Sequence, residues 1–256
     1  MKQLTITLPD LPYAVEEAMN RRRVTIKFCG KNTRKILLTS CLPNEGKSTI
    51  SSYLWKMLAE AGFPTVLVDV DLRKSVMKQR FQMDYDPETA KGLNHYLSGM
   101  AEYNDVVYST NIPNGYLVPC TQLRENPSAL LEDVRYKELL DTLAENYRFV
   151  IIDTPPLGSV SDGALVASLC DGAVLVVRAG VTSKKIIQQS MHEIQQSGCK
   201  LLGTVLNRAD IKGHAYGKYG KYGKYGKYSY GYGYGYGYGS DSTDKGHSKK
   251  ADKKHQ

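Results

Sequence analysis

The chain has 256 residues, of which 41% are hydrophobic, so it can bury a large core and is not disordered throughout. Its 34 Lys and Arg residues outnumber its 26 Asp and Glu residues, and this net charge of +8 favours an anionic partner such as a nucleotide, a nucleic acid or a lipid headgroup. The 5 Cys residues show no C-x-x-C spacing, which argues against a zinc site and indicates reduced thiols.

The N-terminal residues do not resemble a secretory signal, because Met1–Pro12 has no continuous apolar run behind a basic start. The longest apolar stretch, Ala164–Val177, carries Asp171 in its middle and is too short to cross a bilayer. We therefore expect a cytoplasmic protein without a membrane span of its own.

Six apolar runs predict buried strands in the first 211 residues. In chain order they are Lys35–Ser40, Thr65–Asp69, Gly115–Pro119, Phe149–Asp153, Ala173–Val177 and Leu201–Leu206. Three helices are predicted between them: Lys47–Ala61, a helix opened by Asn126 and Pro127 that continues through Leu143, and a helix capped by Thr182 or Ser183 that ends at Gly198. Continuous apolar strands separated by helices indicate an α/β fold with a doubly wound, mostly parallel sheet, in which ligands bind at the carboxyl ends of the strands.

The composition of the chain changes near Ile211. Residues 212–256 hold 10 Lys, 3 Asp and neither Glu nor Arg, together with 10 of the 19 Tyr and 11 of the 23 Gly. This tail therefore carries a net charge of +7, while residues 1–211 carry only +1. Because the tail has almost no aliphatic side chains to bury, we expect a folded domain over residues 1–211 and a disordered tail over residues 212–256.

A phosphate-binding loop is predicted between the first strand and its helix, in the sequence Cys41-Leu-Pro-Asn-Glu-Gly-Lys-Ser-Thr49. Such a loop wraps backbone N–H groups around phosphates and directs a helix N-terminus at them. Lys47 would reach the β- and γ-phosphate oxygens, and the Ser48 hydroxyl would bind magnesium. Cys41 replaces the first glycine of the usual G-x-x-x-x-G-K-[ST] pattern, and a chance Gly-Lys-Ser at a helix start is the competing interpretation.

Two other predicted strands end in carboxylates that suit a magnesium nucleotide. Phe149–Asp153 ends at Asp153, a position that in P-loop proteins holds magnesium, usually through water. Thr65–Asp69 is followed by Asp71 and Arg73, so two carboxylates at positions i and i+2 point the same way. One carboxylate can help to hold magnesium, and the other can orient or deprotonate an attacking hydroxyl. Alternatively, Asp71 could do no more than cap the following helix.

These motifs together resemble the bacterial tyrosine kinase (BY-kinase) family, the P-loop kinases of capsule and exopolysaccharide export, over about residues 12–210. The family's deviant Walker A, A′ (D-x-D-x-R) and Walker B patterns match residues 40–49, 66–73 and 150–156. Two further landmarks are Gly92-Leu93 with Leu97-Ser98-Gly99, and Asn126-Pro127 with Leu130-Leu131. The resemblance implies a P-loop NTPase fold of the MinD- and ParA-like kind.

The resemblance also implies an activity and a set of site residues. The activity is that of a protein-tyrosine kinase with ATP and Mg²⁺, which converts ATP and L-tyrosyl-protein to ADP and O-phospho-L-tyrosyl-protein. The implied catalytic residues are Lys47, Asp69, Asp71 and Arg73. The implied magnesium ligands are Ser48, Asp69 and Asp153. The implied ATP-binding residues are Pro43, Asn44, Glu45, Gly46, Lys47, Ser48, Thr49, Asn207 and Arg208.

Some of these residues have more specific implied roles. Asp71 would be the base toward the tyrosine hydroxyl, and Arg73 would support the site electrostatically. Asn207 and Arg208 lie where relatives contact adenine, although Asn207 could equally be a turn residue.

Relatives use an E-x-x-R-x-x-R helix to close a ring, in which the tail of one subunit enters the site of the next. Here Glu17 and Arg23 keep the first and last positions, but Asn20 stands in place of the middle arginine. Arg21 and Arg22 could take over the role of that arginine. A homo-oligomeric ring is therefore expected, with a solvated basic helix face as the alternative.

Because the chain starts directly with the kinase body, it resembles the Gram-positive type of the family, which has no fused transmembrane domain. The resemblance implies activation by the cytoplasmic C-terminal segment of a membrane-anchored polysaccharide co-polymerase. It also implies recruitment to the inner face of the cell membrane by that activator, and a cognate tyrosine phosphatase.

The tail tyrosines are regularly spaced, and the resemblance implies that they are autophosphorylated in trans. Five of them follow one another at intervals of three and five alternate with glycine: Tyr216, Tyr219, Tyr222, Tyr225, Tyr228, Tyr230, Tyr232, Tyr234, Tyr236 and Tyr238. Two other interpretations of a basic, tyrosine-rich tail are binding to single-stranded nucleic acid and binding to anionic lipid. Given the kinase-like body, we expect no specific nucleic-acid partner.

Two rival functions remain for the whole chain. A MinD- or ParA-like partition or positioning ATPase would share the fold, but those proteins carry a signature lysine in K-G-G-x-G-K, where this chain has Leu42 followed by Pro43-Asn44. They also lack the D-x-D-x-R motif and a tyrosine cluster. The second rival is a non-catalytic scaffold that presents the tail.

Overall fold

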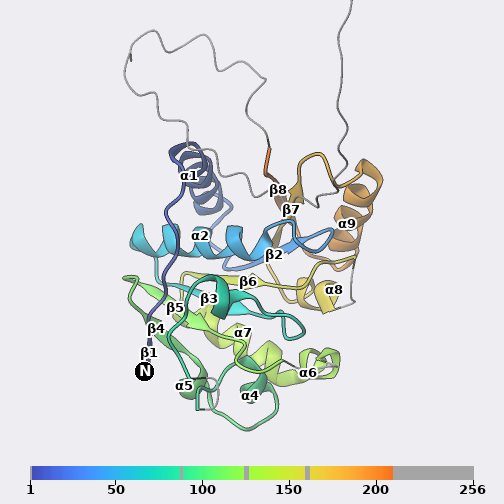
Figure 1. Cartoon of the computed structure of the whole chain (residues 1–256). Helices are drawn as coiled ribbons and strands as arrows, with labels where there is room; N and C mark the ends of the chain where they lie inside the picture. The colour runs from blue at the N-terminus through green and yellow to red at the C-terminus, as the bar shows by residue number, and fades with distance from the viewer. Residues whose placement is uncertain (1, 87–88, 124–126, 159–161, 210–256) are drawn as a thin grey trace, which may run out of the picture. The chain divides into compact units, whose positions relative to one another are not determined.

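A computed structural model describes residues 2–86, 89–123, 127–158 and 162–209. Its strands form one sheet in the order β1-β4-β5-β3-β6-β2-β7-β8 (Figure 1). The strands are β1 (Gln3–Leu4), β2 (Lys35–Ser40), β3 (Thr65–Asp69), β4 (Tyr108–Thr110), β5 (Gly115–Val118), β6 (Phe149–Asp153), β7 (Gly172–Arg178) and β8 (Leu201–Asn207). Neighbouring strands are parallel except β4 and β5, which run antiparallel. The predicted α/β fold with a doubly wound, mostly parallel sheet is therefore confirmed.

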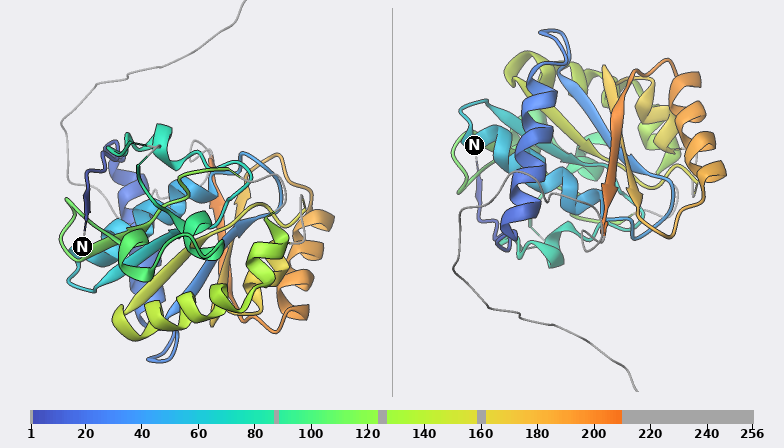
Figure 2. Two further views of the ribbon diagram at one scale, coloured as in Figure 1. Left: turned by 90° about the horizontal axis from the view of Figure 1, so that it is seen from below. Right: turned by 90° about the horizontal axis from the view of Figure 1, so that it is seen from above.

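Helices cover both faces of this sheet (Figures 1 and 2). The helices are α1 (Tyr13–Lys27), α2 (Lys47–Glu60), α3 (Met77–Arg80), α4 (Leu93–Leu97), α5 (Tyr103–Val106), α6 (Ser128–Glu132), α7 (Val134–Asn146), α8 (Asp162–Ala167) and α9 (Lys184–Gln196). Because successive side chains of a strand point to opposite faces, Ile36 packs with Trp55 of α2, while Leu37 belongs to the cluster that contains Leu139 of α7. The two apolar clusters cover both faces of β2, which explains its unbroken apolar run Ile36–Leu38.

The structure corrects some predicted element boundaries. The predicted strand Gly115–Pro119 ends one residue earlier, at Val118. The single helix predicted to run from Asn126 through Leu143 is two helices, because Asp133 has extended backbone angles (φ −66°, ψ 143°) and its side chain caps α7 by accepting a hydrogen bond from Arg135 N. Of the two caps proposed for α9, Ser183 is the one whose side chain accepts from a helix N–H.

The sequence did not predict β1 and β4, which are only 2 and 3 residues long. Strands this short carry too little periodicity to be recognised, and they form here by pairing with strands far away in the chain. The predicted tail, residues 212–256, lies outside the described residues. Among the described helices, none is both long and apolar enough to cross a membrane.

Candidate active site

The sheet order brings the three predicted motifs to one edge. β6 lies between β2 and β3, so the loop after β2, the acidic segment after β3 and the end of β6 are neighbours. Asp69 and Asp153 are directly paired across β3 and β6, and Leu38 near the end of β2 pairs with Asp153 on its other side. Motifs that are up to about a hundred residues apart in sequence therefore converge at the carboxyl ends of parallel strands.

The loop that precedes α2 adopts a conformation that requires glycine at one position. Gly46 has a φ of 95°, in the left-handed region, and it immediately precedes the first helical residue, Lys47. A Cβ atom on Gly46 would lie 2.2 Å from Nδ2 of Asn207 at the end of β8. This loop therefore packs directly against the residue that was predicted to contact adenine.

Glu45 holds this loop to the neighbouring strand through a buried carboxylate that is only 2% exposed. Its Oε2 accepts a hydrogen bond from Leu42 N at 2.8 Å, while its Oε1 accepts from Arg178 N at 3.0 Å and from the Thr182 hydroxyl. The sequence predicts Glu45 as part of the ATP-binding loop, and the structure shows its side chain engaged in bracing that loop against the end of β7.

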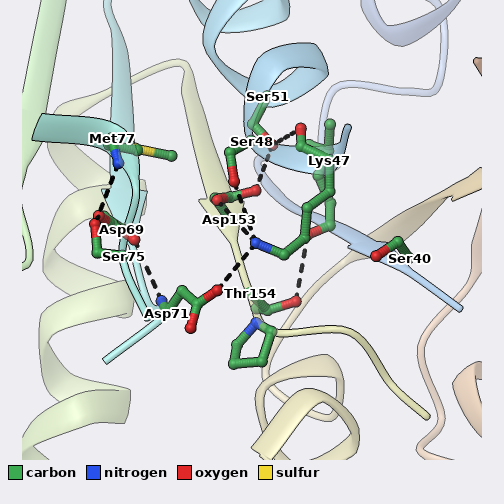
Figure 3. A network of polar contacts seen from close by, with 12 residues as sticks. Ser40, Lys47, Ser48, Ser51, Asp69, Asp71, Ser75, Met77, Asp153 and Thr154 are labelled. Atoms are coloured by element: carbon green, nitrogen blue, oxygen red, sulfur yellow. Dashed lines mark hydrogen bonds and ion pairs between the residues drawn. The ribbon is translucent and has the colours of Figure 1, made fainter. Parts of the chain in front are cut away.

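Lys47 lies at the centre of the site (Figure 3). Its Nζ is 3.2 Å from Asp71 Oδ2, 3.4 Å from Asp153 Oδ2 and 3.2 Å from Ser48 Oγ. Burial acts to lower the pKa of the Lys47 ammonium, but the nearby carboxylates of Asp153, Asp71 and Asp69 outweigh it and raise the pKa. Lys47 therefore stays protonated at neutral pH and presents a fixed positive charge.

Asp69 has a different environment from the other two carboxylates. Burial and the neighbouring charge of Asp153 raise the pKa of Asp69 to about 7. Its Oδ2 accepts a hydrogen bond from the Ser75 hydroxyl, which acts to lower that pKa, and its Oδ1 accepts from Asp71 N at 3.3 Å. A cation at this carboxylate would favour its ionised form.

Each carboxylate oxygen of Asp71 has its own partner. Its Oδ2 pairs with Lys47, and its Oδ1 accepts a hydrogen bond from Lys74 N at 3.1 Å, which closes the turn after β3. The side chain is therefore held by a turn at one oxygen and faces the Lys47 ammonium with the other.

The residues predicted to hold magnesium fit a hard cation. Ser48, Asp69 and Asp153 offer only oxygen atoms, which are the ligands that Mg²⁺ prefers, and all three side chains are buried at the same edge of the sheet. Among the described residues, no group of three or more His, Cys, Asp or Glu side chains could hold a metal ion. Mg²⁺ is usually bound through one or two carboxylates together with nucleotide phosphates, so the three side chains would hold it only together with a nucleotide.

A cavity of about 230 Å³ lies at this edge of the sheet. The loop before α2 lines this cavity with Gly46, Lys47 and Ser48. The segment after β3 lines it with Asp71 and Arg73. Lys74 and Arg80 add two further positive side chains to its lining, and Arg80 Nη1 donates to Thr49 Oγ1 at 3.1 Å. The cavity thus combines several cations with a helix N-terminus, which suits a polyphosphate.

Arg73 is held from outside the motif that contains it. Its Nε is 2.9 Å from Oδ2 of the buried Asp162 at the start of α8, and its Nη2 donates to the Ser128 hydroxyl of α6 at 3.2 Å. Ser128 also donates to Asp162 Oδ1 at 2.6 Å. The guanidinium therefore ties the segment after β3 to α6 and α8 while it lines the cavity.

The remaining predicted residues lie at different distances from this centre. Asn207 Nδ2 donates to Glu45 O at 2.8 Å, which places the amide against the loop. Its Oδ1 accepts from Arg208 N, which is typical of a turn residue. Glu17 is exposed on α1, and Arg23 is half-buried with its Nε 3.4 Å from Asn20 Oδ1. Neither α1 residue belongs to the cavity, and the predicted tail tyrosines lie outside the described residues.

Sequence reasoning missed two hydroxyl groups that contact Asp153 and Asp69. Ser51 Oγ lies 2.8 Å from Asp153 Oδ1, and Ser75 donates to Asp69. Ser51 could have been found, because it lies one helical turn after Lys47 and therefore on the same side of α2. Ser75 follows Asp69 by six residues in a turn, and no periodicity identifies it.

Comparisons with known proteins identify the family of the chain. A family model described as an AAA domain matches residues 31–201. The tyrosine-protein kinase CpsD of Streptococcus agalactiae is 41% identical over 202 residues, which cover 79% of this chain and 87% of that protein.

Solved structures lead to the same family. The kinase domain of the Escherichia coli tyrosine kinase ETK matches with a TM-score of 0.69 and 30% identity, over 79% of this chain and 80% of that one. A septum site-determining protein MinD from Pyrococcus horikoshii, solved with Mg-ADP, matches with a TM-score of 0.58 at 23% identity over 68% of this chain and 69% of that one, which shows a shared fold only. The deviant P-loop, the three converging carboxylates and these relatives together show that the chain belongs to the bacterial tyrosine-protein kinase family and is a nucleotide-binding P-loop transferase.

Proposed function

We propose that the chain uses ATP and Mg²⁺ to phosphorylate its own C-terminal tyrosines in trans, and that it thereby regulates the synthesis and export of a capsular or exopolysaccharide. The observation that carries this proposal is the placement of one ammonium, Lys47, between the carboxylates of Asp71 and Asp153 in a cation-lined cavity. A phosphoryl-transfer site needs such a fixed positive charge beside a carboxylate that can accept a proton.

Each side chain then has a definite task. Lys47 stabilises the negative charge on the transferring γ-phosphoryl group, with Arg73 as a second cation in the same cavity. Asp71 accepts the proton of the tyrosine hydroxyl as the phenolic oxygen bonds to phosphorus and ADP departs. Ser48, Asp69 and Asp153 would hold Mg²⁺, which supplies neutralising charge at the phosphates when it is bound.

The remaining nucleotide contacts come from the loop and from the end of β8. Backbone N–H groups of the loop from Pro43 to Thr49 would surround the phosphates at the start of α2. Asn207 and Arg208 would contact adenine, and this is supported by the position of Asn207 beside Gly46.

The tyrosine acceptors in this proposal belong to a neighbouring subunit of a ring. Glu17 and Arg23 on α1 would contribute to the subunit contact, and the exposure of Glu17 allows this. Each phosphotyrosine adds roughly −1.5 to −2 charges at neutral pH, so a few phosphates cancel the +7 of the tail and ten reverse it. We infer that this reversal loosens the ring.

A mixing experiment tests transfer in trans. One chain carries Lys47→Met and an intact tail, and the other carries an intact site with all ten tail tyrosines replaced by Phe. Phosphotyrosine on the Lys47→Met chain after incubation with ATP and Mg²⁺ is the expected result. ATP hydrolysis without phosphotyrosine on either chain would instead favour a partition-type ATPase, and the absence of both activities would favour a scaffold.

The ring and its activator need separate measurements. Native mass spectrometry before and after ATP treatment tests the ring, and an unchanged oligomer mass under full tail phosphorylation would contradict the loosening. The proposed activator is the cytoplasmic C-terminal segment of a membrane-anchored polysaccharide co-polymerase, which would also recruit the kinase to the membrane. Addition of that segment should raise the rate of phosphorylation, and a cognate tyrosine phosphatase should reverse the product.

A further inference from the structure

Ser75 contacts the acidic centre from a turn that the known motifs do not include. It lies two residues beyond Arg73, in the segment between β3 and α3, and is half-buried. Its hydroxyl donates a hydrogen bond back to Asp69 Oδ2, six residues earlier in the chain. The turn that returns Ser75 to Asp69 is closed by Lys74 N, which donates to Asp71 Oδ1 at 3.1 Å.

The Ser75 hydroxyl has a second partner, which is compatible with its donation to Asp69. Met77 N points at Ser75 Oγ from 3.4 Å, so this N–H occupies a lone pair of the oxygen (Figure 3). The single hydroxyl proton is then available for Asp69. Ser75 therefore donates to the ionised carboxylate of Asp69.

Asp69 is oriented only by uncharged donors among the contacts of the described residues. Ser75 holds one oxygen and Asp71 N holds the other at 3.3 Å, while the Lys47 ammonium pairs with Asp71 and Asp153 instead. A carboxylate that is 2% exposed and loses a donor is attracted toward a neighbouring cation, and the charge of Lys47 acts on Asp69. In that position the Asp69 oxygens would no longer face a magnesium ion at the nucleotide phosphates.

We propose that Ser75 is a positioning residue that holds the Asp69 carboxylate away from Lys47 and toward the Mg²⁺ of the bound nucleotide. This inference rests on the proposed role of Asp69 as a magnesium ligand. Partners that orient a metal ligand typically change metal affinity or activity roughly 10- to 100-fold when they are removed.

The test measures binding of a non-transferable ATP analogue by calorimetry over a series of Mg²⁺ concentrations, with the full chain. Mg²⁺ increases the affinity for the analogue, and the Mg²⁺ concentration that gives half of this increase is the quantity compared. For Ser75→Ala this concentration should be roughly 10- to 100-fold higher than for the parent chain. The same variant should bind the analogue in EDTA about as tightly as the parent chain does. Ser75→Thr keeps the hydroxyl and should restore the magnesium dependence.

Matched variants separate this role from a structural one. Ser75→Val has the shape of Ser75→Thr without the hydroxyl, so the Thr and Val pair isolates the hydrogen bond even if Ser75→Ala does not fold. Ser168→Ala removes an exposed hydroxyl that donates to Leu165 O at 2.7 Å and should match the parent.

An equal magnesium requirement in Ser75→Thr and Ser75→Val overturns the inference, as does an equal loss of affinity with and without Mg²⁺. Because the analogue cannot transfer its phosphate, a failure of tail phosphorylation would contradict the proposed function and leave this binding result standing.

Discussion

Replacement of Glu45 by Gln tests how the phosphate-binding loop is held in place. The Glu45 carboxylate receives three donors: Leu42 N at one oxygen, and Arg178 N and the Thr182 hydroxyl at the other. A glutamine side chain has nearly the same shape but only one acceptor oxygen.

The magnitude follows from the two orientations that the amide can take. If its oxygen faces Arg178 N, its NH₂ group opposes Leu42 N, which lies 2.8 Å from the carboxylate in the parent. If its oxygen faces Leu42 N, Arg178 N loses its acceptor, while the Thr182 hydroxyl can rotate and accept. Each orientation leaves one buried backbone N–H unpaired, which costs about 1–3 kcal/mol. Because a buried charge is removed at the same time, we expect a net loss of about 2 kcal/mol.

Thermal and urea unfolding without nucleotide measure this loss. A destabilisation of about 2 kcal/mol lowers the melting temperature of a domain of this size by roughly 4–8 °C. Glu145→Gln, on the exposed face of α7, is the control and should change stability by less than about 0.5 kcal/mol. If Glu45→Gln is as stable as this control, the carboxylate does not brace the loop and the reasoning is wrong.

Three further variants test other parts of the site and fold. The pKa of Asp69 is about 7 in the folded chain against 3.8 ordinarily, so the folded chain binds the Asp69 proton more tightly than the unfolded chain does. The stability that comes from this difference is present below about pH 4 and is lost as the pH rises through 7. Asp69→Asn should therefore stabilise the chain in EDTA by up to about 4 kcal/mol at pH 8 and by less at pH 5, as measured by urea unfolding. The same variant should no longer phosphorylate its tail. An equal gain in stability at both pH values would contradict this reasoning. Gly46→Ala should cost about 2 kcal/mol through its positive φ and its clash with Asn207, and calorimetric unfolding should show part of that cost relieved when Asn207→Ala is added. Asp133→Ala should cost about 1 kcal/mol by removing the cap of α7, and an unchanged melting temperature would show that the break between α6 and α7 does not depend on this cap.

The elements that were predicted well are those whose signals are local. The run Phe149–Ile152 is apolar at every position because both faces of its strand are covered, and that pattern is readable without any partner strand. The residues Gly46, Lys47 and Ser48 predict a phosphate-binding loop, because such a loop binds phosphate with successive backbone N–H groups and is therefore a local feature of the sequence. β4 could not be predicted, because a three-residue strand is defined by pairing with β5 rather than by its own sequence.

The roles of the side chains within the site depended on the fold. The sequence placed Glu45 among the nucleotide contacts, whereas its carboxylate is bonded by Arg178 and Thr182, more than 130 positions away. Arg73 was expected to support the site electrostatically, and its partner Asp162 lies at the start of α8, 89 positions later.

Sequence alone thus determined which chemical groups are present and at which strand ends they occur, because motif spacing and apolar periodicity are local properties. The tertiary structure decided which carboxylate faces Lys47 and which is held by a serine hydroxyl, because those choices arise from hydrogen bonds between segments that meet only when parallel strands align. Asp69, Asp71 and Asp153 have the same side chain, and their surroundings in the folded sheet give them different electrostatic environments.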